Sequence, residues 1–138
     1  MPTKDIFHKV VKNALIKEGW TITHDPLFIQ FGGVDVYVDL GAERIIAAQK
    51  DSRKIAVEVK SFVSPSVISE FHLALGQFIN YRVALNAEDP NRVLYLAVPN
   101  DVYKTFFILQ FTQVVVETYQ LKLIVYEVKQ EVILKWQE

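Results

Sequence analysis

Residues 55–62 have the sequence Ile55-Ala56-Val57-Glu58-Val59-Lys60-Ser61-Phe62. Their β-branched and aromatic side chains predict a strand of the hydrophobic core. Glu58 and Lys60 are two positions apart, so both charged side chains point to the same face of that strand. Removing two charges from water costs several kcal/mol unless they pair, bind a metal ion or border a cleft. The stretch therefore indicates a functional site or, alternatively, an ion pair on the polar face of a strand.

The composition of the whole chain limits the class of protein. Its 138 residues are 51% apolar and include no Cys, which fits a single domain over residues 1–138 with one core. Without Cys there are no disulfide scaffolds, thiolate zinc sites or cysteine catalysis, and a reducing cytoplasm is expected. No apolar run approaches the roughly 20 residues of a membrane span, and the first residues lack the apolar core of a signal peptide. We therefore expect a soluble, cytoplasmic protein with no membrane association.

The charge balance bears on nucleic-acid binding. The net charge is −1, from 15 basic and 16 acidic residues, so the overall field does not draw the protein to a polyanion. Affinity for DNA must then come from a local patch, a metal ion or a partner. The candidate basic residues, which are equally interpretable as solvated faces, are Lys9, Lys12, Lys17, Lys50, Arg53 and Lys54.

The N-terminal part predicts one helix followed by strands. Thr3 can cap a helix whose apolar positions recur at helical spacing and which ends at Gly19. Short strands are predicted next at residues 20–23 and 27–31, on either side of an Asp25-Pro26 turn. Residues 34–40 alternate with period two, so Asp39 lies on their polar face.

A hairpin is predicted after these strands, with strands at 43–49 and 54–62 and a turn at Lys50-Asp51-Ser52-Arg53. A turn centred near Ser52 places Ile46 opposite Glu58, which leaves Asp39 about seven positions, or over about 20 Å, further along. Asp39 then reaches Glu58 only if the chain bends, and a bulge at residues 41–44 would fold it back. Otherwise Glu43 supplies the second carboxylate.

The segment after the hairpin predicts a long helix. Ser64-Pro65 is a favourable start, and residues 66–85 continue with an apolar stripe. Glu70, Gln77 and Tyr81 lie on the shoulder of this stripe, and the last two, four residues apart, project together.

The C-terminal part predicts further strands. Residues 92–98 form a nearly continuous apolar run, typical of an interior strand, and the long helix before it favours parallel pairing with the preceding strand. Residues 101–119 predict one buried helix, although 114–116 also suit a strand. Two short closing strands are expected at 121–128 and 131–136. The segment 103–111 is more apolar than one core face needs, which indicates an interface such as that of a homodimer.

The resulting order is α-β-β-β-α-β, with an acid before the hairpin and Glu-x-Lys in the next strand. This pattern resembles the PD-(D/E)XK nuclease superfamily, to which restriction endonucleases and Holliday-junction resolvases belong, and Asp39, Glu58 and Lys60 match its core motif. The resemblance implies an α/β, restriction-endonuclease-like core with a mixed central sheet flanked by helices. It also implies that Asp39 and Glu58 hold Mg²⁺ (or Mn²⁺), while Lys60 positions or activates the attacking water. Mg²⁺ prefers oxygen ligands and lowers the pKa of a bound water, and a lysine offsets the charge of a phosphorane.

Gln77 and Tyr81 provide a second match. Their spacing fits the Gln-x-x-x-Tyr signature that follows the Glu-x-Lys strand in RecB-like nucleases, which implies that they orient Lys60 or the substrate backbone. The alternative is a packed helix edge, because such pairs also arise by chance.

A closer resemblance covers almost the whole chain. The segments that carry it are residues 19–26, 39–43, 55–62, 74–78 and 92–99. They resemble the XisH family of cyanobacterial fdxN-element excision controlling factors. The resemblance implies a role in programmed excision of a DNA element during heterocyst development, with DNA, a site-specific recombinase and the companion factor XisI as partners. Two functions are consistent with it: a Mg²⁺-dependent endonuclease-like site acting on DNA, or a catalytically inert regulatory module of the same fold.

Overall fold

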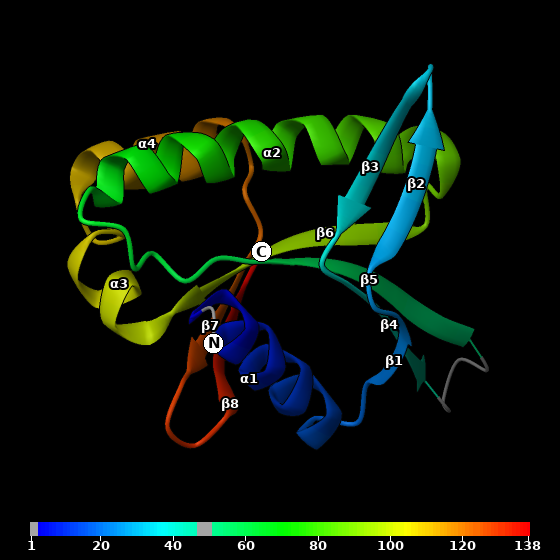
Figure 1. Ribbon diagram of the computed structural model, residues 1–138, viewed down its shortest axis with the longest axis horizontal. Coiled ribbons are helices and arrows are strands. Elements are labelled where there is room, and N and C mark those ends of the chain that lie inside the picture. Colours follow the sequence, from blue (N-terminus) through cyan, green and yellow to red (C-terminus); the bar gives the residue numbers. More distant parts are fainter. Residues whose placement is uncertain (1–2, 47–50) are drawn as a thin grey trace.

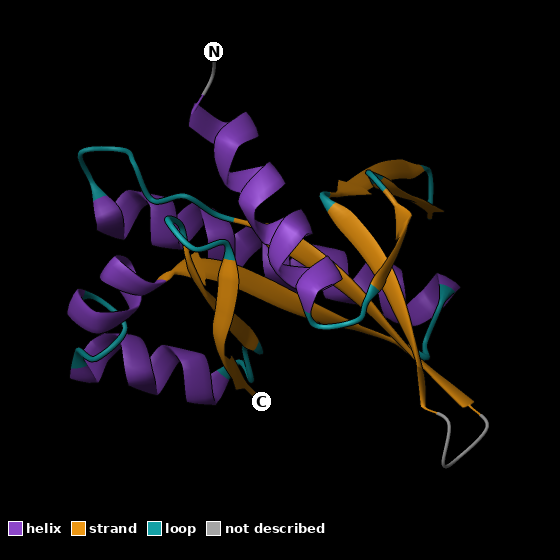
Figure 2. Ribbon diagram, turned by 90° about the horizontal axis from the view of Figure 1, so that it is seen from below, coloured by secondary structure: helices purple, strands orange, loops and turns teal. Residues whose placement is uncertain are grey.

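Helices cover both faces of a central sheet in the computed structural model, which describes residues 3–46 and 51–138 (Figure 1 and Figure 2). The helices of this described part are α1 (Thr3–Lys17), α2 (Val67–Glu88), α3 (Asn100–Thr105) and α4 (Gln110–Thr118). Its strands are β1 (Thr21–His24), β2 (Leu27–Phe31), β3 (Val34–Val38), β4 (Leu40–Ile46), β5 (Asp51–Val59), β6 (Arg92–Pro99), β7 (Leu123–Glu127) and β8 (Val132–Gln137).

The central sheet is mixed. Its strand order is β1-β4-β5-β6-β7-β8. The strands β5, β6 and β7 run parallel, whereas β4 is antiparallel to β5, and β8 is antiparallel to β7. The strands β2 and β3 form a separate hairpin, which stands beside one end of α2 (Figure 1). The predicted fold class is therefore confirmed as a mixed α/β fold with a mixed central sheet flanked by helices.

Two apolar layers hold the helices to the sheet. On one face, Val11 and Leu15 of α1 are fully buried against a cluster that includes Val57. On the other face, Phe71 of α2 packs into a cluster that includes Ala56. Successive residues of β5 alternate between these layers, as a pleated strand requires. This alternation turns Glu58 and Lys60 toward the side of the sheet that α2 covers.

Several predicted elements are confirmed. The predicted helix at residues 66–85 is present as α2, and its N-cap Ser66 accepts a hydrogen bond from the Ser69 N–H at 3.2 Å. The predicted parallel pairing between the strand of Glu58 and the strand after α2 is present as β5 and β6. The two closing strands are present as β7 and β8. None of the described helices is long and apolar enough to cross a bilayer.

The predicted hairpin turn is wrong. Asp51 already begins β5 and pairs with Ile46, while Lys50 and the end of the strand predicted at 43–49 lie outside the described residues. Leu40 pairs with Val57, so the next position, Asp39, lies beside Glu58 with no bend at residues 41–44. The residues at the outer end of β5 are polar and lack the alternation of apolar and polar positions that identifies a strand. Their composition therefore predicts a turn.

Two other predicted elements are divided in the structure. The strand predicted at 34–40 ends at Val38, and the chain bends at Asp39 before β4 enters the central sheet. The single buried helix predicted at 101–119 is also wrong, because α3 ends at Thr105 and α4 begins only at Gln110. Between them, Phe106 and Phe107 turn inward and make edge-to-face ring contacts with Phe71 of α2. These core contacts outweigh the continuous helix that local propensity favours.

Candidate functional site

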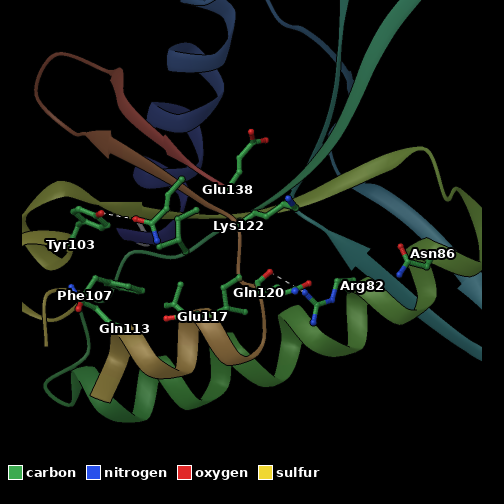
Figure 3. A pocket seen from close by; sticks show the side chains of 13 residues that line it. Arg82, Asn86, Tyr103, Phe107, Gln113, Glu117, Gln120, Lys122 and Glu138 are labelled. Atoms are coloured by element: carbon green, nitrogen blue, oxygen red, sulfur yellow. Dashed lines mark hydrogen bonds between the residues drawn. The ribbon is translucent and has the colours of Figure 1, made fainter. Parts of the chain in front are cut away.

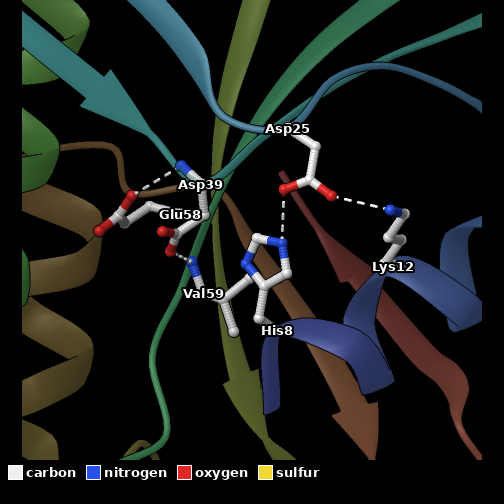
Figure 4. A network of polar contacts seen from close by, with 6 residues as sticks. All are labelled: His8, Lys12, Asp25, Asp39, Glu58 and Val59. Atoms are coloured by element: carbon white, nitrogen blue, oxygen red, sulfur yellow. Dashed lines mark hydrogen bonds and ion pairs between the residues drawn. The ribbon is translucent and has the colours of Figure 1, made fainter. Parts of the chain in front are cut away.

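Asp39 and Glu58 meet where the chain passes from β3 to β4 (Figure 4). The Val59 N–H donates a hydrogen bond to Asp39 Oδ2 at 2.8 Å. In return, the Asp39 N–H donates to Glu58 Oε1 at 3.2 Å. These two bonds connect the neighbouring strands. They fix both carboxylates, because Glu58 is bonded to the backbone N–H of Asp39, and Asp39 is bonded to the backbone N–H of the residue after Glu58. Asp39, which the predicted turn places about seven positions beyond the residue facing Glu58, is thus a direct neighbour of Glu58 in the structure.

Lys60 completes this group at the end of β5. Its Nζ lies 3.6 Å from Glu58 Oε2, and the two side chains are only 13% and 7% exposed. The Lys60 N–H donates to the Ala97 carbonyl at 2.9 Å, and the Tyr126 hydroxyl donates to the Lys60 carbonyl at 2.8 Å. Burial raises the pKa of that Tyr126 hydroxyl, so it remains a donor. We call Asp39, Glu58 and Lys60 the acid–lysine cluster.

Burial of the acid–lysine cluster has a high desolvation cost. Each charge that leaves water costs several kcal/mol, and the attraction between the two partners of a buried ion pair often only balances that cost. Here two carboxylates share one nearby lysine, so the cluster carries an excess of negative charge. Carboxylate oxygens in such a setting are possible ligands for a cation.

The helix α2 brings Tyr81 and Gln77 to the same region. Burial raises the pKa of Tyr81, and the negative charges of Glu58 and Asp39 raise it further. Gln77 lies one helical turn before Tyr81 on the same side of α2. Its Oε1 is buried without a hydrogen-bond partner in the described part of the chain, which costs about 1–3 kcal/mol unless a donor reaches it.

A hollow of about 260 Å³ opens beside the cluster, and we call it the small hollow. It is lined by Phe7 and His8 of α1, Asp39, Val59, Lys60, Ser61, Val63 and Glu70 of α2. His8 was not among the site residues predicted from the sequence, because one histidine on an amphipathic helix has no distinctive spacing. Glu70 did carry a signal, since it lies on the same helix shoulder as Gln77 and Tyr81.

Glu43, the alternative second acid, lies elsewhere on the hairpin. It pairs with Lys54 across β4 and β5. Lys54 is four positions from Glu58, or about 13 Å at roughly 3.3 Å per residue. The register therefore selects Asp39 as the neighbour of Glu58.

The donor set suits a hard divalent cation with an incomplete protein shell. Within residues 3–46 and 51–138, no set of three or more His, Asp or Glu side chains could enclose a metal ion. Mg²⁺ does not require one, because it keeps several waters and commonly binds through one or two carboxylates and substrate phosphates. The oxygens of Asp39 and Glu58 fit that requirement.

A second hollow, of about 930 Å³, lies between α2, α4 and the C-terminal strand (Figure 3). Its charged lining residues, by which we define the large hollow, are Arg82, Glu117, Lys122 and Glu138. Arg82 donates to the Gln120 carbonyl at 3.1 Å. The Tyr103 hydroxyl donates to Gln137 Oε1 at 2.7 Å. None of the five predicted site residues lines this hollow.

The fold and the site together define a mixed α/β protein in which a buried acid, Glu58, a half-buried acid, Asp39, and a lysine lie where β3, β4 and β5 meet. Comparison with known families matches residues 1–134 to the XisH protein family. The chain therefore belongs to the XisH family.

Two crystal structures share this fold over nearly the whole chain. An XisH family protein from Nostoc punctiforme PCC 73102 is 55% identical, with a TM-score of 0.90 over 97% of this chain and 100% of that one. An fdxN element excision controlling factor protein from Anabaena variabilis is 56% identical, with a TM-score of 0.89 over 97% of this chain and 99% of that one. Both source organisms are cyanobacteria. No curated protein gives a significant match.

Proposed function

We propose that this chain is a nuclease-like domain of the PD-(D/E)XK type that acts on DNA with Mg²⁺ or Mn²⁺. The observation that carries the proposal is the reciprocal hydrogen bonding between Asp39 and Glu58, with Lys60 Nζ 3.6 Å from Glu58 Oε2. Fixed carboxylates beside a buried lysine are what a metal-assisted phosphodiester cleavage needs.

Each residue of the site has a distinct expected role. Asp39 and Glu58 would hold the metal ion, which when bound supplies an activated water and offsets negative charge on the phosphate. The Lys60 ammonium positions the attacking water and stabilises the charge that develops on the phosphate oxygens. Gln77 and Tyr81, from the facing helix α2, orient Lys60 or the sugar-phosphate backbone.

The connectivity of the central elements also supports the proposal. The central sheet and its helices follow the chain in the order α1, β1, β4, β5, α2 and β6, in which β1, β4 and β5 pair antiparallel and β6 pairs parallel with β5. This order supports our proposal of a restriction-endonuclease-like core in a single domain over residues 1–138. The hairpin of β2 and β3 is then an insertion before the core hairpin.

The biological setting follows from the relatives. The protein from Anabaena variabilis, 56% identical to this chain, is described as an fdxN element excision controlling factor. We infer the same setting for this chain, namely control of the excision of a DNA element in heterocyst development. A site-specific recombinase and an XisI-like protein would be its partners.

The decisive experiment is strand cleavage of branched, single-stranded and duplex DNA with Mg²⁺ or Mn²⁺. The wild type should cleave at least one of these substrates, and Glu58→Ala should remove the activity. Glu43→Ala is the matched control, because it removes an acid from the same hairpin without touching the acid–lysine cluster, and it should retain activity. Equal cleavage by wild type and Glu58→Ala would rule out the proposed site.

A second function is favoured by the charge of the chain. Its net charge of −1 gives no general attraction to DNA, and Ile108, Leu109 and Phe111 are about half exposed, at 58%, 48% and 55%. These features suit a catalytically inert regulator that keeps the nuclease-like fold and works through protein partners or a second copy. It would form a stable complex with an XisI-like protein and cleave no DNA with any metal. A pull-down that recovers no such protein would count against it.

A further inference from the structure

His8 and Asp25 form a close pair at the edge of the small hollow (Figure 4). His8 Nε2 lies 2.7 Å from Asp25 Oδ1. A carboxylate accepts at this distance, so the proton of the neutral imidazole is on Nε2 and the lone pair is on Nδ1. In the described part of the chain, Nδ1 makes no hydrogen bond. The pair therefore presents a basic nitrogen that is not already in use.

The geometry of the pair is fixed from two sides. Lys12, one helical turn after His8, donates from Nζ to the second oxygen, Asp25 Oδ2, at 2.8 Å. Burial alone would raise the pKa of Asp25, but the hydrogen bonds from Lys12 and His8 outweigh it, so that pKa is lowered and the carboxylate stays ionised. The helix itself is anchored by the fully buried residues Val11 and Leu15. The imidazole of His8 is thus carried by a rigid helix and oriented by the charged Asp25 side chain.

The second ring nitrogen of His8 faces the acid–lysine cluster. Figure 4 shows it turned away from Asp25, toward the side on which Asp39 lies. His8, Asp39, Lys60 and Glu70 all line the small hollow, which at about 260 Å³ has room for a phosphate group and the water that attacks it. The hollow thus brings His8 of α1 together with the carboxylate of Asp39 and the ammonium of Lys60.

We propose that His8 is a further catalytic residue of this site, the acceptor of the proton from the attacking water, and that Asp25 is its positioning residue. This inference rests on the proposed nuclease function. The water oxygen forms a bond to phosphorus, the bond from phosphorus to one ester oxygen breaks, and the water proton moves to His8 Nδ1. The departing ester oxygen takes a proton from solvent, and His8 later returns its proton to solvent. Asp25 stabilises the imidazolium in between, as a carboxylate does in a catalytic triad.

Proton transfer suits His8 better than metal binding does. Among the described residues, His8 does not join Asp39 and Glu58 in any set that could enclose an ion. Its hydrogen bond to the Asp25 carboxylate orients the ring.

The test uses the full chain and the DNA substrate that the wild type cleaves. The variants are His8→Gln, His8→Gly, Asp25→Asn and Asp25→Glu. His24→Gln is the matched control, since His24 is an exposed histidine bonded to Thr23 Oγ1 at 2.9 Å and lies outside the small hollow. Circular dichroism confirms that each variant is folded.

We expect His8→Gln to lower kcat by about 10²-fold or more, and His24→Gln to leave it unchanged. Added imidazole should restore part of the activity of His8→Gly but not of Glu58→Ala, a readout that a purely structural role would not change. Asp25→Asn should lower kcat with little change in KM, and Asp25→Glu should recover part of the loss. Wild-type rates in folded His8→Gln, while Glu58→Ala is inactive, would overturn the role of His8 alone. Failure of the wild type to cleave any substrate would overturn this inference together with the proposed function.

Discussion

The large hollow and the small hollow differ both in volume and in the environment of their charged side chains. The large hollow has more than three times the volume of the small one, about 930 Å³ against about 260 Å³. Yet its acids, Glu117 and Glu138, are exposed to solvent. In the small hollow, Asp39 accepts a backbone hydrogen bond from Val59, and the Lys60 side chain is only 13% exposed. Fixed charges in an apolar setting, rather than volume, identify the candidate site.

The largest expected effect is that of Asp39→Asn. This change keeps the shape of the side chain and an oxygen for the Val59 N–H, but removes the negative charge that a divalent cation needs. We expect cleavage to fall by about 10³-fold or more, and binding of Mn²⁺, measured by calorimetry, to be lost. Glu117→Gln makes the same kind of change in the large hollow and should alter neither quantity. Similar losses in both variants would remove the distinction between the hollows.

Lys60→Met should have the next largest effect. It removes the ammonium but keeps a long apolar side chain in the same place. Cleavage should fall by about 10²-fold to 10³-fold, while Mn²⁺ binding should be retained, because the two carboxylates lose only a competing cation. The control is Lys122→Met in the large hollow, for which single-turnover cleavage should equal that of the wild type. Loss of metal binding in Lys60→Met would contradict the division of roles between acids and lysine.

Tyr81→Phe should have a smaller effect. A single hydrogen bond contributes about 0.5–1.5 kcal/mol, so the loss of the hydroxyl should lower the cleavage rate by up to about tenfold. Tyr103→Phe removes a hydroxyl from the large hollow and its bond to Gln137, and should affect thermal stability but not cleavage. Cleavage that depends on Tyr103 and not on Tyr81 would move the active region to the large hollow.

The smallest effects are shifts of tyrosine pKa. They distinguish the acids of the two hollows without any measurement of activity. Burial, followed by the hydrogen bond to and charge of Glu138, raises the pKa of Tyr95 to about 12. We expect Glu138→Gln to lower that pKa and leave Tyr81 unchanged. Glu58→Gln should do the reverse, because Glu58 and Asp39 act on Tyr81. Carbon-13 NMR of labelled tyrosine rings measures both, and an unmoved Tyr81 in Glu58→Gln would contradict the placement of its hydroxyl near the acids.

The same shift predicts how stability depends on pH. The folded-state pKa of Tyr95 is about 12, against an ordinary value of 10.0. Because the folded state retains the proton more strongly, the contribution of Tyr95 to stability is complete below pH 10 and is lost as the pH rises from about 10 to about 12. Thermal unfolding in this range should show a smaller decrease for Glu138→Gln than for the wild type. An equal decrease in the two proteins would be inconsistent with this coupling.

The sequence predicts most of the elements but not the junctions between them. The stripe of α2 and the apolar run of β6 are long and strongly patterned, so periodicity is sufficient to place them. The end of β3 before Asp39 cannot be recognised from the period-two pattern of residues 34–40, because the strands on each side of Asp39 continue the same alternation. The division between α3 and α4 depends on contacts of Phe106 and Phe107 with Phe71, more than 30 positions away in the chain. Such contacts are invisible to local propensity.

The candidate site was predicted in its residue types but not in its geometry. Glu58 and Lys60 share a strand, so their common side follows from spacing alone. The distance from Asp39 to Glu58 depends on the register of β4 against β5, and a turn placed a few residues too late moves the acids far apart. His8 and Asp25 are separated by 17 positions and meet only because α1 packs against the turn after β1. No sequence period connects them.

Diffraction from crystals soaked in Mn²⁺ would show whether Asp39 and Glu58 bind an ion, because the anomalous signal locates the ion independently of any activity. We expect one ion in contact with carboxylate oxygens of both Asp39 and Glu58, and its disappearance in crystals of Asp39→Asn. If Mn²⁺ binds only elsewhere, or if the two acids remain without an ion at saturating Mn²⁺, the acid–lysine cluster is a buried ion pair and not a metal site.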